Sequence, residues 1–329
     1  MKNKNCLYRG FLLIMCMCIL ICGLSGCQKD EELIITNGTG TTMGNIAMSR
    51  GTFAYQNGLL YFLDPETIFE YDMDSGKTVF FPTETLDQCD MHITQNHVVF
   101  CGTVKVKEGY KTCAIAMTKD GKRITTVFEP SVGCGHLYLN ENEAYYLSAI
   151  DGDLFHRDME TDVETKLLEK VHSYSLTDSH LYVTQIVDEK CVLKARFHGE
   201  DAFYEIPLTF EPLQVLAANN ELFINQKKPH QVVRYCDGEE IPLPIHSVKY
   251  QYLNGKIIYS DDKTFKNSSW TVKSYDLDTG AEQVLCEGVF EFGVFEEGFA
   301  VFWCRTETGS VWKIFDFETN ELKQIYPSA

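Results

Sequence analysis

Short apolar segments alternate with turn-forming residues along most of the chain. In the first clear example, the apolar segments Leu59–Leu63 and Ile68–Tyr71 are bounded by Asn57-Gly58 and Asp74-Ser75-Gly76. Asn-Gly supplies the positive φ angles that a two-residue hairpin turn requires. This stretch therefore predicts two antiparallel strands between tight turns.

The same two turns recur six more times. One marker residue in each first turn defines seven units, whose spacing averages about 40 residues. A strand rich in aromatic and aliphatic residues follows each marker. Each unit thus has four short strands, which together with this period is typical of a β-propeller blade. The markers are Gly58, His97, Glu143, His180, Glu221, Gly255 and Gly298.

We therefore predict an all-β chain whose residues 46–329 form a seven-bladed β-propeller of four-stranded antiparallel blades. Closure of the blades into a ring removes exposed sheet edges. An irregular β-sandwich is the alternative, but it does not explain why both turns recur in seven units.

The connections predict which face of the ring binds a ligand. With the strands of a blade labelled a to d from the axis outward, the a–b and c–d turns are the short, repeated ones. The b–c and d–a connections, such as Thr103–Lys111 and Ser260–Ser269, are long and irregular. Binding residues concentrate on variable loops held by a rigid framework. We expect ligand contacts on this b–c/d–a face from Tyr110, His230, Phe265, Lys266, Trp270 and Arg305.

Residues 1–26 have the pattern of a signal peptide. A basic start precedes the apolar run Phe11–Gly23, which is too short to span a bilayer comfortably. The run ends in Leu24-Ser25-Gly26-Cys27, which resembles the bacterial lipobox. That resemblance implies cleavage before Cys27 and a diacylglycerol on its thiol. An ordinary secretory signal or a short membrane helix is the alternative.

Charge and composition refine this picture. Residues 27–45 would form the lipidated Cys and a flexible tether, because they are charged and then rich in Thr and Gly. The formal net charge of −18 makes the chain a poor partner for nucleic acid or anionic lipid surfaces. We expect a monomer that is anchored covalently to the cell membrane. It would face outside the cytoplasm, at the cell surface or in the periplasm, and bind protein or glycan.

The cysteines give no metal or redox motif. Eight of the thirteen lie in the predicted propeller, and none forms a Cys-x-x-Cys pair. Most lie in or beside predicted strands, where Cys behaves as a small buried hydrophobe. Cys101 and Cys113 face each other across one predicted hairpin and could form a disulfide. Free buried thiols are the favoured alternative.

Candidate catalytic residues are few. His92, His136, His172 and His246 are predicted near the start of innermost strands, at the mouth of the central channel. Converging histidines could bind a metal or transfer protons, as in a propeller enzyme such as a polysaccharide lyase, a hydrolase or a cyclase. Their offsets from the markers differ, so we expect neither a metal nor catalysis. The Asp72-x-Asp74-x-Gly76 turn lacks the closing Glu of a calcium loop and is expected to be a hairpin turn.

The segments Gly44-Asn45-Ile46, Asn57-Gly58-Leu59-Leu60-Tyr61-Phe62 and Tyr61-Phe62-Leu63-Asp64 carry a resemblance. They resemble a bacterial family of unknown function that is similar to the YWTD-like propeller of low-density-lipoprotein-receptor-related proteins. The resemblance covers about Gly44–Ala329 and implies an extracytoplasmic propeller without established catalytic residues. The Trp-docking positions of quinoprotein-like repeats are missing, so no cofactor is expected. The expected function is a non-catalytic binding or scaffold module; an envelope-assembly factor is a further alternative.

Overall fold

Alternating apolar and polar positions form antiparallel strands throughout the described part of the chain. The computed structural model describes residues 40–45, 51–64, 67–82, 86–94, 96–106, 109–119, 124–148, 150–266, 268–306 and 309–326. All of these belong to one unit, Ile35–Ala329. The predicted signal peptide and Cys27 lie outside the described residues. Within the described residues, no helix has the length and apolar character needed to cross a membrane.

The first five blades are separate four-stranded sheets. Blade 1 comprises β1 (Phe53–Gln56), β2 (Leu59–Asp64), β3 (Thr67–Asp72) and β4 (Thr78–Pro82). Blade 2 comprises β5 (Leu86–Ile93), β6 (His97–Val106), β7 (Gly109–Thr118) and β8 (Ile124–Phe128). Blade 3 comprises β9 (Cys134–Leu139), β10 (Glu143–Ser148), β11 (Leu154–Asp158) and β12 (Glu164–Leu168). Blade 4 comprises β13 (Val171–Leu176), β14 (His180–Val187), β15 (Lys190–Phe197) and β16 (Tyr204–Ile206), and blade 5 comprises β17 (Pro212–Ala218), β18 (Glu221–Gln226), β19 (Gln231–Cys236) and β20 (Glu239–His246).

Blades 6 and 7 share one long strand, β24 (Glu282–Phe295), within a seven-stranded sheet. The first half of β24 pairs with β23, and its second half pairs with β25. It is therefore the outermost strand of blade 6 and the innermost strand of blade 7, which gives seven four-stranded blades as predicted. The other strands of this sheet are β21 (Tyr250–Leu253), β22 (Lys256–Lys266), β23 (Ser269–Asp276), β25 (Phe299–Thr306), β26 (Gly309–Asp316) and β27 (Glu321–Tyr326).

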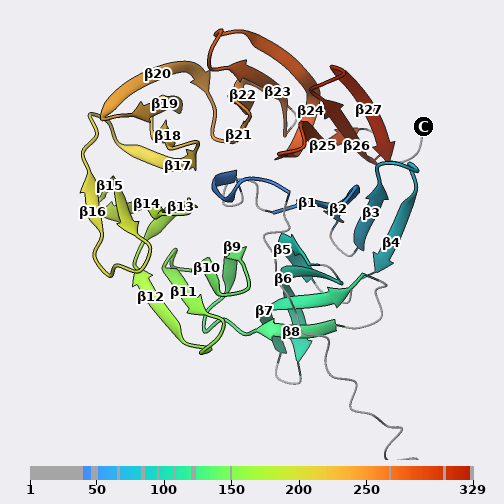
Figure 1. Cartoon of the computed structure of the whole chain (residues 1–329), viewed down its shortest axis with the longest axis horizontal. Helices are drawn as coiled ribbons and strands as arrows, with labels where there is room; N and C mark the ends of the chain where they lie inside the picture. Colours follow the sequence, from blue (N-terminus) through green and yellow to red (C-terminus); the bar gives the residue numbers. More distant parts are fainter. Residues whose placement is uncertain are drawn as a thin grey trace, which may run out of the picture. The chain divides into compact units, whose positions relative to one another are not determined.

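The blades follow one another around a central axis (Figure 1). Innermost strands of successive blades contact each other, as β1 does with β5, β5 with β9, β13 with β17, and β17 with β21. A buried cluster that includes Tyr138, Val171 and Tyr174 joins blades 3 and 4. Because β24 also contacts β1, the ring is closed. The chain is therefore a seven-bladed propeller, and all seven marker residues lie at a–b turns.

The turn residues explain where the strands end. Asn57 and Gly58 have φ angles of 52° and 81°, the left-handed values that this hairpin turn needs. In the c–d turn of blade 1, one carboxylate oxygen of Asp72 accepts the amides of Asp74 and Ser75 at 2.9 Å. The carboxylate thus caps a hairpin turn, as expected from the sequence.

Two of the predicted long loops are mostly strand. The hairpin of β6 and β7 continues to Val106 and Gly109, and that of β22 and β23 continues to Lys266 and Ser269. In the first hairpin, Val104 and Val106 extend the alternating β-branched pattern, so strand pairing continues where loops were predicted.

Side chains bridge the inner edges of neighbouring blades. The Ser175 hydroxyl of blade 4 accepts the Ala217 amide of blade 5 at 2.9 Å. The Gln251 amide of blade 6 donates to the Phe292 carbonyl at 3.1 Å, and its oxygen accepts the Val294 amide at 2.9 Å. An innermost strand has no further strand beside it, so these bridges satisfy its buried backbone groups.

Blades 7 and 1 meet without exchanging a strand. Within the described residues, blade 1 contains β1–β4 and blade 7 contains β24–β27, with no strand from the other blade in either. The ring of the buried Trp312 lies 5.4 Å from that of Phe53 and 4.3 Å from that of Phe62, measured between centroids. Side-chain packing therefore closes the ring at this contact, which we call the seam. Its buried cluster comprises Phe53, Leu60, Phe62, Phe69, Tyr71, Phe295, Phe299, Val301, Trp312, Ile314 and Ile325.

Residues 40–45, which we call the axial segment, lie in the centre of the ring (Figure 1). The Asn45 side chain donates to the Tyr252 carbonyl at 2.7 Å and accepts the Tyr252 amide at 2.8 Å. At the other end of the segment, the Gly40 carbonyl accepts the Glu296 amide at 2.9 Å. Both partners lie at the a–b end of innermost strands. The axial segment is therefore held by the innermost strands at that end.

Small residues allow the axial segment to enter the ring. A Cβ atom on Gly44 would lie 2.0 Å from the Ala217 carbonyl oxygen, so no larger residue fits there without movement of the backbone. Met43 packs against the cluster between blades 3 and 4. The sequence analysis assigned residues 40–45 to the tether, but these contacts place them within the propeller unit.

Candidate functional site

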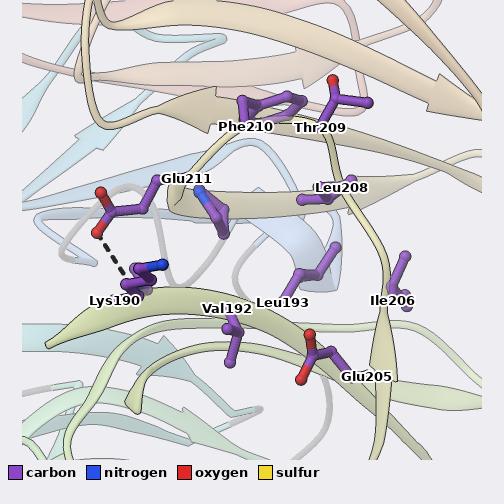
Figure 2. Close-up of a pocket in the computed structure, with 11 residues that line it drawn as sticks. Lys190, Val192, Leu193, Glu205, Ile206, Leu208, Thr209, Phe210 and Glu211 are labelled. Carbon is purple, nitrogen blue, oxygen red and sulfur yellow. Dashed lines mark hydrogen bonds between the residues drawn. The ribbon is translucent and has the colours of Figure 1, made fainter. Parts of the chain in front are cut away.

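A cleft of about 340 Å³ opens between blades 4 and 5 (Figure 2). One wall is the first part of β15, directly after the b–c turn of blade 4. The other wall is the d–a connection that leads into β17. The outermost strand β16 has only three residues and pairs with Leu193–Ala195. The start of β15 therefore faces the cleft instead of a fourth strand.

The lining mixes polar and apolar surface, with the apolar part slightly larger. Figure 2 shows Leu193 and Val192 of β15 below the cleft, and Leu208 and Phe210 of the d–a connection above it. The volume is at the lower end of the range for ligand pockets. It suits one or two apolar side chains of a larger partner.

Hydrogen bonds hold the polar rim in place. One carboxylate oxygen of Glu211 accepts the Cys191 amide at 3.0 Å and the Lys227 ammonium at 2.7 Å. The hydrogen bond from Lys227, aided by that from Cys191, lowers the pKa of Glu211, which stays charged. On the other side, the Thr209 amide donates to Glu240 at 2.7 Å. These bonds fix the d–a connection, so the cleft is formed before any ligand arrives.

The thiol of Cys191 lines the cleft without being reactive. Burial raises its pKa to about 11, and the nearby Glu211 adds to this effect. At neutral pH the group is a thiol, and the thiolate is the nucleophilic form of cysteine. Cys191 therefore contributes apolar surface to the lining.

The b–c turn beside the cleft adds exposed aliphatic surface. Ile186 and Val187, which precede this turn at the end of β14, are 45% and 37% exposed. Exposed apolar groups next to an apolar cleft are typical of a surface that docks a partner.

A second pocket, of about 410 Å³, lies between blades 5 and 6 and is polar. The Lys273 ammonium is 2.6 Å from an oxygen of Asp261 and 3.9 Å from one of Glu282. Burial opposes ionisation of Asp261, but the hydrogen bonds and charges of Lys273 and Lys263 together outweigh it and lower the pKa. The two lysines of the lining balance the two carboxylates, so the pocket offers little free charge to a ligand.

The predicted ligand residues lie away from the cleft between blades 4 and 5. His230, in the b–c connection of blade 5, has its Nδ1 atom 3.5 Å from an oxygen of Asp262. Trp270 lies beneath the Lys249 ammonium, 5.1 Å from its ring centroid, and Lys249 also pairs with Glu291 at 2.7 Å.

Arg305 is exposed at the end of β25. The side chains of Tyr110, Phe265 and Lys266 lie outside the described residues.

His92 lies near the end of β5 and not near its start as predicted, and it has a structural role. Its side chain is buried between blades 2 and 3, where Nε2 accepts the Leu139 amide at 3.2 Å. Nδ1 must then carry the proton and donate to the Asp90 carbonyl, 3.0 Å away. Burial lowers the pKa of His92 to about 4, despite the opposing hydrogen bond to Asp90. The neutral imidazole is therefore another bridge between innermost strands.

The other three predicted channel histidines do not form a site with His92. His136 and His172 lie near the start of β9 and β13, and burial, His136 and Lys227 lower the pKa of His172. His246 ends the outermost strand β20, where its Nδ1 atom is 3.3 Å from the Pro229 carbonyl oxygen. Its predicted position on an innermost strand was wrong, because the next innermost strand starts only at Tyr250. The described residues contain no group of three or more His, Cys, Asp or Glu side chains placed to hold a metal ion.

The cleft residues were missed from the sequence. A signal for them exists in the segment that follows Tyr204–Ile206. Pro207 cannot donate a ladder hydrogen bond and therefore favours an early strand end. Leu208 and Phe210, which follow Pro207, are apolar residues outside any strand.

Comparisons with known proteins identify the fold. No protein-family model and no curated protein matches the chain. The β-propeller domain of the Trilobed protease from Pyrococcus furiosus, described as having an open velcro topology, aligns with a TM-score of 0.56 and 14% identity. The alignment covers 82% of this chain and 94% of that chain. This chain is accordingly a β-propeller protein.

Two peptidases contain a similar fold. The acylaminoacyl peptidase of Pyrococcus horikoshii aligns with a TM-score of 0.58 and 13% identity, over 88% of this chain and 54% of that chain. A puromycin-hydrolyzing peptidase of Mycobacterium tuberculosis aligns with a TM-score of 0.55 and 10% identity, over 75% and 49%. This chain spans about half the length of these peptidases, and at such identities the similarity shows the fold alone.

Proposed function

We propose that this chain is a lipid-anchored lipoprotein outside the cytoplasm whose propeller binds a protein partner without catalysing a reaction. The observation that carries the proposal is the preformed apolar cleft between blades 4 and 5. An aliphatic or aromatic side chain of the partner would fill it. Burial of apolar area in such a pocket is the usual energetic centre of a protein interface.

Charge favours a cationic segment as the partner. Glu205 lies at the mouth of the cleft, and Asp188 and Glu189 form the adjoining b–c turn. Lys227 is already paired with Glu211, and Lys190 is the cation in the described lining, so the three other carboxylates leave the rim acidic. An apolar anchor flanked by Lys or Arg would be complementary to this rim and to the net charge of −18.

A protein fits the cleft better than a glycan does. Phe210 is the one aromatic ring among the described lining residues, and the rim hydrogen-bonding groups already bind each other. Sugar rings need aromatic faces and free polar partners, whereas an apolar side chain needs neither.

The experiment is selection of a random peptide library, displayed on phage, against the full-length chain in detergent micelles. We expect the enriched peptides to contain an apolar residue beside Lys or Arg. The substitution Leu208→Asp should lower the affinity of the chain for these peptides about tenfold or more. Val284→Asp is the matched control, because Val284 is 53% exposed on blade 6. Peptides that bind the Leu208→Asp variant with unchanged affinity, or a library from which no peptide is enriched, would contradict the proposal.

A further inference from the structure

Two buried cysteines meet where blades 6 and 7 join. Cys286 lies in the half of β24 that pairs with β23, and Cys304 lies near the end of β25. Their sulfur atoms are 3.6 Å apart, and each side chain is 2% exposed. Both are free thiols in this structure. The distance is that of two sulfur atoms in van der Waals contact.

We propose that Cys286 and Cys304 are an oxidation site that forms a disulfide bond when the protein meets a peroxide. The Cys304 thiolate attacks one peroxide oxygen, the O–O bond breaks, and the other oxygen leaves as hydroxide. The sulfur of Cys286 then attacks the resulting sulfenic acid and expels its hydroxyl group. With hydrogen peroxide, two thiols and one peroxide give one disulfide and two water molecules.

The surroundings favour attack by Cys304. The Cys286 thiol can donate a hydrogen bond to the Cys304 sulfur, and this lowers the pKa of Cys304 against the effect of burial. The positive charge of Lys313, on the neighbouring strand β26, acts in the same direction. Cys304 thus has the electropositive setting of an oxidation-sensitive cysteine, with its resolving partner already in contact.

Among the cysteines whose side chains the structure describes, the other pairs lack this combination. The register pairs Cys101 with Ala114 and Cys113 with Gly102. Cys101 and Cys113 therefore lie on opposite faces of blade 2 and cannot form the disulfide that the sequence left open. Cys101 instead contacts Cys134, but that hydrogen bond and burial raise the pKa of Cys101. It remains a thiol at neutral pH.

The disulfide would fasten the two blades that share β24. It would close a short loop of the chain, and such a crosslink stabilises a fold mainly by restricting the unfolded state. The expected effect is a rise in the thermal unfolding midpoint after peroxide treatment, which a reducing agent reverses.

The experiment uses the full-length chain in detergent micelles, reduced and then treated with hydrogen peroxide. Thiols are alkylated after unfolding, and non-reducing peptide mapping locates the crosslinks. We expect one crosslink, between the peptides of Cys286 and Cys304, and loss of alkylation at both. Cys304→Ser should abolish the crosslink and the rise in midpoint, whereas Cys236→Ser, at a cysteine with no nearby thiol partner among the described residues, should retain both.

Non-reducing peptide mapping of the wild-type protein is sufficient to test the proposed disulfide, so the test does not depend on the folding of a variant. Full alkylation of Cys286 and Cys304 under conditions that oxidise Cys236 would overturn the proposal. So would oxidation that stops at a sulfinic acid on Cys304, or a crosslink between Cys101 and Cys134 in its place.

Discussion

The seam between blades 7 and 1 should be the place where the ring opens most easily. Other neighbouring blades are joined by a covalent connection and by inner-edge contacts, whereas the seam has side-chain packing and contacts between β1 and β24. We therefore predict that Phe62→Ala loosens the seam more than an equivalent substitution loosens another blade interface. The matched control is Phe223→Ala, between blades 5 and 6, because both rings are fully buried.

The magnitudes follow from the contacts of each ring. A buried Phe→Ala substitution costs about 3–5 kcal/mol of unfolding free energy. Phe62 stacks on Phe69 at 4.9 Å and packs on Trp312 at 4.3 Å, whereas Phe223 contacts one ring, Tyr252, at 5.8 Å. An aromatic pair adds about 0.5–1.5 kcal/mol beyond its buried area. Phe62→Ala should therefore cost about 1 kcal/mol more than Phe223→Ala.

Two measurements test this difference. Urea denaturation, followed by tryptophan fluorescence, gives the unfolding free energy of each variant. Trp312 and Trp303 stack at 5.4 Å beside the seam and will report its opening directly. Hydrogen exchange then shows which strands lose protection, and in Phe62→Ala these should be β1–β4 and β25–β27.

The reasoning fails if both variants lose the same free energy and exchange rises evenly around the ring in each. It also fails if Phe223→Ala exposes the seam strands first. Either result would mean that the covalent connections between blades contribute little to local stability.

Three further predictions concern other contacts. The free energy of unfolding should fall by about 3 kcal/mol as the pH drops from 6.5 to 4, because the unfolded chain binds a proton at His92 in this window and the folded chain does not. The difference between the urea midpoints at the two pH values should be smaller in His92→Gln than in the wild-type protein. Asn45→Ala should lower the free energy of unfolding by about 1–3 kcal/mol, because it leaves the amide and carbonyl of Tyr252 without their partner. An unchanged urea midpoint would show that the axial segment contributes nothing to the stability of the fold. Cys27→Ser should abolish incorporation of labelled palmitate into the protein in growing bacteria, and a variant that is still labelled would refute lipidation at this residue.

The repeated local signals were sufficient to predict the blades. Turn chemistry acts over a few residues, so Asn57-Gly58 and its equivalents locate a hairpin without knowledge of the fold. Seven such units with a period of about 40 residues then allow few architectures other than a propeller. The marker residues accordingly lie at a–b turns in all seven blades.

The candidate site and the closure of the ring depend mainly on contacts between distant segments, and Pro207 is the one local signal noted for the cleft. Phe62 and Trp312 form the seam, yet each stands in an apolar pattern shared by other blades. Gly44 enters the ring because it lacks a side chain, and a composition rich in Gly and Thr indicates flexibility when read alone. The cleft exists because β16 ends early, and strand ends are the features that sequence patterns locate least well.

The axial segment also sets an order of events during synthesis. Its partners Ala217, Tyr252 and Glu296 follow it by well over a hundred residues, and the last belongs to the turn that starts blade 7. The segment leaves the ribosome before its partners but can reach its final position only after the turn that starts blade 7 has been made. The centre of the ring is therefore filled by an early part of the chain at a late stage of folding.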